Sequence, residues 1–380
     1  MNNRERLLTV LKGEVPDRVP VSLYLEEEFL GFMFPGRVVD RVIDAVECSK
    51  YFGFELMTRS RTFERIPYYL KKSFLNWDVK QNIIRQKGLY TIISEIQTPL
   101  KTLKQVETGP DVGLGVEGIN LMETEVLIKD ESDFEAFIKF VPKIDRETID
   151  EMKTYCDWSK NIIGDLGLSV PWTWGGIYNQ ASRLRGMQQL MMDPYLDPDF
   201  YREFMNKITE LAVEVARELA IANGDAIGIK GNIANASMIG KNFFDEFILP
   251  YEKCLVEAIH DEGSFTIYHN CGKAEVLLPS YLELGITAWE TVAEPPQGDN
   301  DLARAKKMVG DKMTLIGNLD QVVFLKTASV AEVEERTKQI VSLGKPGGRY
   351  IFAVSDLLEK NTPFENIFAA VNTVKNFGSY

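Results

Sequence analysis

Two residues that commonly bind metal ions lie two positions apart in the second half of the chain. The segment 266–272 reads T-I-Y-H-N-C-G and contains His269 and Cys271. In an extended segment, residues i and i+2 point to the same side, so an imidazole and a thiolate at this spacing can bind one ion. The pair supplies half a zinc site. The alternative is two ordinary packed side chains, because a structural zinc ion takes about four ligands.

Carboxylates follow three other short apolar segments. Glu290 and Glu294 follow one segment, Asp320 follows the next, and Asp356 follows the last. Each could bind a metal ion, act as a general acid or base, or cap the helix that comes next, and capping is the usual role in a short loop that enters a helix. Glu290 and Glu294 are our candidates for a fourth ligand or a catalytic proton carrier.

Aromatic and amide side chains supply candidates for substrate binding. Trp172 and Trp174, in the segment V-P-W-T-W-G-G, share one side if the chain is extended there. They could form the wall of an aromatic or quaternary-ammonium pocket, or they could simply pack under a lid. Asn232 and Asn235 could donate hydrogen bonds to a polar substrate, although asparagine is also common in turns.

All these residues follow short apolar runs that are typical of strands. Amphipathic, helix-like segments separate the last five runs, and this alternation predicts a parallel sheet. Eight runs match a closed (β/α)₈ TIM barrel, an α/β fold whose active site lies at the carboxyl ends of the strands. An open doubly wound sheet is the competing fold, but no GxGxxG motif follows a first strand. The eight runs are 19–25, 54–58, 162–169, 226–233, 265–269, 286–292, 313–317 and 350–354.

The chain reads as a single domain, residues 1–380, with one interruption. No linker or low-complexity tract divides it. Residues at about 61–139 break the regular alternation: 89–97 mixes apolar and polar residues like a half-buried strand, and glycines and a proline interrupt the stretch that follows, at Gly109, Pro110, Gly113, Gly115 and Gly118. We predict an inserted, partly antiparallel segment that caps the barrel.

Composition excludes several classes of protein. Hydrophobic residues make up 45% and charged residues 26% of the 380 residues, which is typical of a globular protein. The net charge of −13 would repel a phosphate backbone, so we expect no nucleic-acid partner. There is no signal-peptide pattern at the N-terminus and no apolar stretch of ~20 residues, and four cysteines are too few for a disulfide scaffold. We therefore expect a soluble, cytoplasmic protein without a membrane association.

The N-terminal segments N-R-E-R-L-L and G-E-V-P-D-R-V-P resemble the start of uroporphyrinogen decarboxylase superfamily proteins. The resemblance continues nearly to the C-terminus, through T-P-L-K-T-L, I-K-D, the H-x-C-G strand end, G-G-x-Y-I-F and T-P-x-E-N. It implies a (β/α)₈ barrel with an active-site cleft at the carboxyl ends of the strands.

Within this superfamily, the resemblance favours the cobalamin-dependent methyltransferase branch, which uses zinc. Porphyrinogen decarboxylases carry a W-x-M-R-Q-A-G-R stretch after the first strand, which binds the carboxylate arms of the substrate. Residues 23–29 read L-Y-L-E-E-E-F at the corresponding place. Three acidic residues cannot replace an arginine cluster that binds polycarboxylates.

The methyltransferases that serve coenzyme M bind zinc through a His-x-Cys pair and one further Cys after the eighth strand. His269 and Cys271 match the pair, and register with the family puts Asp356 where the second Cys would stand. A carboxylate makes the ion harder than a thiolate does, so we expect a substrate other than the same thiol.

The resemblance therefore implies demethylation of a small methylated substrate, such as a methyl ether or methylamine, with zinc acting as a Lewis acid. The methyl group would pass to the cobalt of a separate corrinoid protein, because no segment of this chain resembles one that carries cobalamin. A decarboxylase-like lyase that acts on a porphyrinogen or another carboxylated substrate without a metal is the alternative. The oligomeric state is left open, with a homodimer as one alternative.

Overall fold

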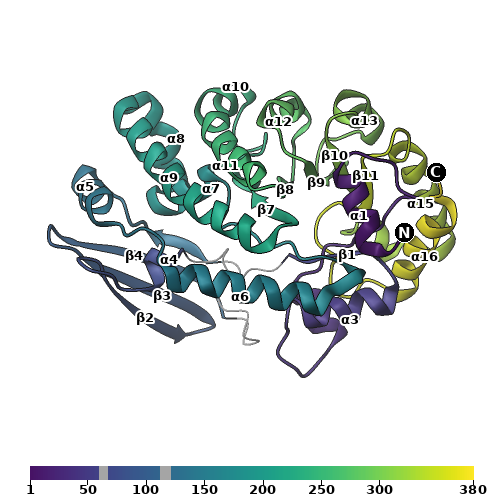
Figure 1. The fold of residues 1–380 in the computed structure, drawn as a ribbon, viewed down its shortest axis with the longest axis horizontal. Helices are drawn as coiled ribbons and strands as arrows, with labels where there is room; N and C mark the ends of the chain where they lie inside the picture. The colour runs from purple at the N-terminus through teal and green to yellow at the C-terminus, as the bar shows by residue number, and fades with distance from the viewer. Residues whose placement is uncertain (60–66, 112–120) are drawn as a thin grey trace.

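The computed structural model describes residues 1–59, 67–111 and 121–380, which form an α/β protein. Helices surround short parallel strands, and an antiparallel sheet lies at one side of the molecule (Figure 1). The helices are α1 (Asn3–Leu11), α2 (Glu27–Met33), α3 (Ile43–Phe52), α4 (Tyr68–Lys71), α5 (Glu131–Phe140), α6 (Arg146–Ile163), α7 (Ile177–Arg185), α8 (Met187–Leu196), α9 (Pro198–Asn223), α10 (Lys241–Phe243), α11 (Leu249–Asp261), α12 (Leu278–Leu284), α13 (Leu302–Val309), α14 (Phe324–Thr327), α15 (Val330–Gly344) and α16 (Phe364–Phe377). Of the helices described, none combines the length and the apolar composition that a membrane span requires.

The parallel strands form two sheets. Five strands pair in the order β11-β10-β9-β8-β7, and β1 pairs with β6. The strands are β1 (Leu56–Met57), β6 (Gly167–Leu168), β7 (Ala226–Lys230), β8 (Phe265–His269), β9 (Ala288–Val292), β10 (Thr314–Leu319) and β11 (Tyr350–Val354).

Isolated contacts connect these two sheets. Val21 forms a parallel bridge with Phe352 of β11, and its carbonyl accepts a hydrogen bond of 2.8 Å from the amide of Glu55. On the other side, Trp172 forms a parallel bridge with Gly228 of β7. The described residues therefore contain no continuous eight-stranded sheet. They contain two parallel sheets that these bridges join.

Several of the expected strands differ from the structure, and the run 54–58 keeps only two strand residues, Leu56–Met57. Residues 19–25 contribute only bridges, and the apolar run 226–233 ends as a strand at Lys230. The run 162–169 begins inside α6, which ends at Ile163, and leaves only two strand residues. A short apolar run cannot distinguish a buried helix end from a strand, which explains the early start.

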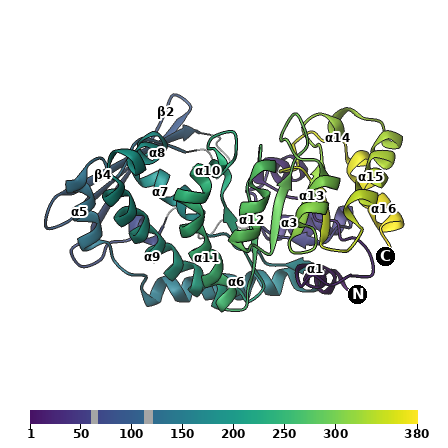
Figure 2. The same cartoon turned by 90° about the horizontal axis from the view of Figure 1, so that it is seen from above.

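The antiparallel sheet lies inside the range expected for an insertion. Its strands pair in the order β2-β3-β4-β5, and alternate residues of β3 are buried on one face. Seen from above, this sheet and α5 lie at the opposite end of the molecule from α14, α15 and α16 (Figure 2). Residues 61–66 and the predicted chain breaks at Gly113, Gly115 and Gly118 lie outside the described residues. The strands are β2 (Asp78–Gln86), β3 (Leu89–Gln97), β4 (Thr102–Pro110) and β5 (Met122–Glu125).

Helix α1 closes one end of the parallel strands. Its N-terminus carries a capping box between Asn2 and Glu5, and its apolar face buries Leu7, Val10 and Leu11. These side chains pack in one cluster with inward-facing residues of the strands. Val170, which follows β6, also belongs to that cluster, and its strand members are Met57, Leu168, Ala226, Ile267, Ala288, Ile316, Ile351 and Ala353.

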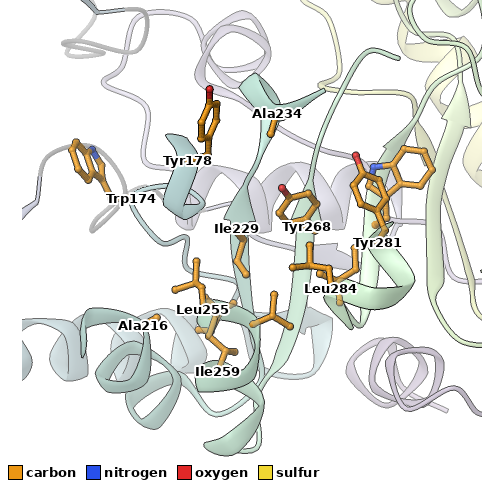
Figure 3. Packing of buried hydrophobic residues seen from close by; sticks show 14 of the residues in the cluster. Trp174, Tyr178, Ala216, Ile229, Ala234, Leu255, Ile259, Tyr268, Tyr281 and Leu284 are labelled. Atoms are coloured by element: carbon orange, nitrogen blue, oxygen red, sulfur yellow. The ribbon is translucent and has the colours of Figure 1, made fainter. Parts of the chain in front are cut away.

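The two faces of β8 have different surroundings. Tyr268 packs against Tyr281 of α12 with ring centroids 5.6 Å apart, among the buried residues of the outer core (Figure 3). Because side chains alternate along a strand, Ile267 and His269 share the opposite, inward face. Ile267 packs in the cluster closed by α1, so His269 lies two residues further along, toward the carboxyl ends of the strands.

Candidate metal centre

The structure brings the three predicted metal ligands together. His269 ends β8, Cys271 follows two residues later, and Asp356 lies two residues beyond the end of β11. One ligand atom from each residue lies within 4.8 Å of the others. The side chain of His269 is 7% exposed, that of Asp356 is 30% exposed, and Cys271 is half-buried. The cluster is therefore buried on the histidine side and open to solvent on the aspartate side.

The donor set fits a zinc ion. Nitrogen, thiolate sulfur and carboxylate oxygen are the three donor types that zinc takes from proteins. The Nε2 atom of His269 lies 3.8 Å from Oδ1 of Asp356, and its Nδ1 atom pairs with Oε1 of Glu290 at 3.0 Å. A histidine that binds a metal through one nitrogen usually has a carboxylate or carbonyl on the other. Glu290 meets this requirement.

Glu290 is itself held by an arginine. Its Oε2 atom accepts a hydrogen bond of 2.6 Å from Nη2 of Arg59, and the side chains of both residues are 2% exposed. Burial acts to raise the pKa of Glu290, but the charge of Arg59 and the bond to His269 outweigh it and lower the pKa to about 2. Glu290 is therefore an anion that is fully paired.

The charges around His269 stabilise its protonated form in the absence of a metal. Burial acts to lower the pKa of His269, but hydrogen bonds to Cys271 and Glu290 and the charge of Asp356 raise it to about 10. Burial raises the pKa of Asp356, and the neighbouring His269 partly offsets this. A metal ion at this cluster must displace the proton of His269, so acid opposes binding.

Two aromatic rings enclose the imidazole. Tyr24 and Trp172 approach His269 edge-on, with ring centroids at 5.6 and 5.7 Å. Trp172 rests on Gly228, where a Cβ atom would lie only 2.4 Å from its ring. The guanidinium of Arg59 lies over the Tyr24 ring at 5.0 Å. Apolar ring edges and charged groups therefore surround the buried side of the cluster.

The structure separates the two tryptophans that the sequence analysis grouped. Only Trp172 faces His269. The ring of Trp174 packs at right angles to Tyr69, 6.4 Å away, and lines a cavity of about 500 Å³ beside α4, α6 and α9. The chain leaves the extended conformation after the bridge at Trp172 and turns at Gly175, so the two-residue alternation no longer applies.

Asn232 and Asn235 stabilise the turn that follows β7. The side-chain oxygen of Asn232 accepts a hydrogen bond from Asn179 at 2.7 Å, and Asn235 donates to the carbonyl of Asn232 at 2.6 Å and accepts from the amide of Ser237 at 2.8 Å. These bonds match the turn role that was the alternative to substrate binding.

Glu294 is paired with an arginine of α15. Both of its carboxylate oxygens accept hydrogen bonds of 2.6 Å from Arg336 of α15. It therefore contributes to an ion pair between a loop and a helix.

Arg59 and Tyr24 are the site residues that the sequence analysis did not select. Arg59 directly follows the predicted strand 54–58, so the rule that pointed to the other strand ends also applies to it. Tyr24 lies within the run 19–25, where nothing in the sequence marks it as a neighbour of His269.

Comparisons with known proteins give the family. Residues 129–377 match the family described as "Uroporphyrinogen decarboxylase (URO-D)". The chain is 24% identical over 208 residues to "Methylcobamide:CoM methyltransferase MtaA" of Methanosarcina barkeri, a match that covers 54% of this chain and 58% of that protein. It is 25% identical over 255 residues to the "Uroporphyrinogen decarboxylase" of Syntrophotalea carbinolica, covering 65% of this chain and 70% of that one.

A second methyltransferase and a solved structure are also similar. The "Methylated-thiol--coenzyme M methyltransferase" of Methanosarcina mazei is 23% identical over 227 residues, covering 60% of this chain and 56% of that protein. The chain thus spans little more than half the length of the two methyltransferases. A solved structure titled "methyltransferase from Methanosarcina mazei" superposes with a TM-score of 0.68 at 17% identity and covers 99% of both chains, which shows a shared fold. The resemblance noted in the sequence is confirmed, and the chain belongs to the uroporphyrinogen decarboxylase family.

Proposed function

We propose that this protein is a zinc-dependent methyltransferase built on a (β/α)₈ barrel. In this proposal, it moves a methyl group from a small methylated substrate, a methyl ether or methylamine, to the cobalt of a separate corrinoid protein. The cluster of His269, Cys271 and Asp356, with ligand atoms within 4.8 Å, is the observation that carries the proposal. The similarity to methyltransferases of Methanosarcina supports the same reaction class.

Each residue in or beside the cluster has a separate role in this proposal. His269, Cys271 and Asp356 would hold the ion, which supplies Lewis acidity toward the oxygen or nitrogen that carries the methyl group. Glu290 fixes the imidazole through Nδ1, and this leaves Nε2 as the nitrogen that would bind the ion. The edges of Tyr24 and Trp172 exclude water from the buried side of the imidazole. Substrate would approach from the side of the partly exposed Asp356.

Acidic residues near the cluster argue against a porphyrinogen substrate. Glu26 and Glu27 belong to the segment 23–29 that stands in place of the arginine-containing stretch of the decarboxylases, and both form ion pairs with Arg41. Glu26 is also close enough to Asp356 to raise its pKa. A substrate with several carboxylates would meet these negative charges, whereas a neutral ether or a cationic amine would not be repelled.

A metal-free, decarboxylase-like lyase is the second candidate, and the match to the Syntrophotalea carbinolica protein favours it. Metal analysis distinguishes the two. We expect about one zinc ion per chain after dialysis, and we expect Cys271→Ala to lose it. Cys254→Ala is the matched control, because Cys254 is an exposed thiol on α11. Full zinc content in Cys271→Ala would contradict the proposed centre.

A methyl-transfer assay then tests the reaction. The enzyme is incubated with a corrinoid protein in the cob(I)alamin state and a panel of methyl ethers and methylamines, and methylcobalamin formation is followed by absorbance. A parallel assay offers methylcobalamin together with thiols or tetrahydrofolate. Transfer in the second assay alone would reverse the proposed direction.

A further inference from the structure

We propose that Arg59 keeps Glu290 from binding the metal, so that the ion has three protein ligands and one position left for substrate. This inference rests on the proposed function, because it concerns how the same centre is completed. It assigns Arg59 as a positioning residue whose effect is on the number of ligands.

Glu290 is a further carboxylate that contacts the cluster, through Nδ1 of His269. It is the register partner of His269 on the neighbouring strand β9, so both side chains leave the sheet on the same inward face. Both of its oxygens are occupied, one by Nδ1 of His269 at 3.0 Å and the other by Arg59 at 2.6 Å. Among the described residues, the group that could hold an ion contains His269, Cys271 and Asp356 without Glu290.

Arg59 is fixed in the position that this role requires. Its Nη1 atom donates a hydrogen bond of 2.5 Å to the carbonyl of Met57, and its own carbonyl accepts one of 2.9 Å from Arg41. Its guanidinium also lies over the ring of Tyr24. Because a guanidinium does not lose its proton in proteins, the charge opposite Glu290 is permanent.

The charge balance of the centre gives this arrangement a chemical purpose. A divalent ion held by one thiolate and one carboxylate has its charge neutralised by Cys271 and Asp356. A second carboxylate from Glu290 would make the centre anionic and fill its fourth position. Catalytic zinc sites keep a position open, and structural sites close it. By pairing with Glu290, Arg59 keeps the centre in the catalytic class.

The decisive variant is Arg59→Met, which keeps an unbranched aliphatic stem and removes the guanidinium and its charge. Glu290 then remains as a buried anion beside the metal without its arginine. We expect it to join the ion and to tighten zinc binding by roughly tenfold in chelator competition. An ordinary supporting role for Arg59 predicts the opposite sign, a loss of ~10–100-fold. Weaker zinc binding in Arg59→Met would therefore overturn the inference.

Two further variants test whether Glu290 is the ligand that is gained. Arg59→Met combined with Glu290→Gln should lose the gain in affinity and bind zinc no more tightly than Glu290→Gln alone. Arg59→Lys preserves the charge and should also bind as the wild type does. A double variant that keeps the tighter binding would refute the role of Glu290.

Substituting cobalt(II) for zinc tests for the open coordination position by absorbance, without an activity assay. Azide should shift the visible bands of the wild-type protein and of Glu290→Gln, because both keep a free position. It should leave Arg59→Met unchanged. If Arg59→Met does not fold, Glu290→Gln alone is decisive: wild-type cobalt bands that do not respond to azide, together with bands of Glu290→Gln that do, would identify Glu290 as the fourth ligand and overturn the inference. A wild-type protein that binds neither metal would instead refute the proposed function.

Discussion

Replacing Gly228 with alanine tests whether the packing of Trp172 defines the position of His269. A Cβ atom at Gly228 would lie 2.4, 2.6 and 2.8 Å from three ring atoms of Trp172, where ordinary contact begins at 3.4 Å. The indole must therefore retreat by about 1 Å. It is 1% exposed, and His269 lies on one side of it at 5.7 Å between centroids. We expect the overpacking to cost ~1–3 kcal/mol of unfolding free energy and to weaken zinc binding by displacing the imidazole.

The assay is urea unfolding together with chelator competition for zinc. Gly31→Ala is the control, because Gly31 lies inside helix α2 and its added Cβ would be in ordinary contact with Val39 at 3.7 Å. Alanine there should stabilise the protein by ~0.5–1 kcal/mol. Adding Trp172→Phe to Gly228→Ala should recover part of the lost stability, since the smaller ring leaves room for the methyl group. If Gly228→Ala unfolds within ~0.5 kcal/mol of the wild type and binds zinc normally, the proposed contact does not constrain the centre.

Three further predictions concern individual side chains. Asp356→Cys should retain zinc and raise methyl transfer from methylcobalamin to thiols relative to transfer from methyl ethers, because a second thiolate softens the ion; an unchanged ratio in the two assays would contradict this. Trp174→Ala should lower the unfolding free energy by ~3–5 kcal/mol and leave zinc content intact, because Trp174 packs against Tyr69 away from the metal ligands; urea unfolding and metal analysis check both parts. The buried Glu252 accepts a hydrogen bond from the amide of Tyr178, and burial raises its pKa from 4.5 to about 7. Its contribution to stability is thus fully present below pH 4.5 and is lost as the pH rises through 7. Glu252→Gln should flatten this pH dependence and raise the unfolding free energy by about 3 kcal/mol relative to the wild type at pH 8. If the unfolding free energies of the two proteins change equally between pH 4 and 8, the prediction is wrong.

The strand-end rule, together with register with the family, explains why the clustering of the three candidate metal ligands could be predicted from the sequence. Parallel strands in an α/β fold direct their carboxyl ends to one side, so residues far apart in sequence meet there. His269 and Asp356 are 87 positions apart, and their side chains approach to 3.8 Å. The two-residue spacing of His269 and Cys271 indicated a shared side because the chain is extended up to His269.

The same rule failed where the chain was not extended. It grouped Trp172 with Trp174, but the last bridge of that strand is at Trp172, and the next residues turn toward α7. It also lengthened the third strand, because the apolar residues at the end of α6 were counted with it. Periodicity over two or three residues does not report where an element ends, since that depends on which partner covers each side chain.

The four carboxylates after the strands show what decides between their possible roles. All four follow a short apolar run, yet each meets a different partner. Asp320 accepts hydrogen bonds from the amides of the residues that follow it and acts as a cap. Glu294 is neutralised by an arginine of α15, and Glu290 by the arginine that follows β1.

Within the part of the chain that the structure describes, Asp356 has neither a lysine nor an arginine as an ion-pair partner, and His269 is the group closest to its charge. A carboxylate that is partly buried without a permanent cation is the one that gains most from a metal ion, because burial makes its unpaired charge costly. The partner arginines are 42 and 231 positions away from the carboxylates that they neutralise, so residue spacing could not identify these ion pairs. Register with the family singled out Asp356, and the fold shows that the other three carboxylates have other partners.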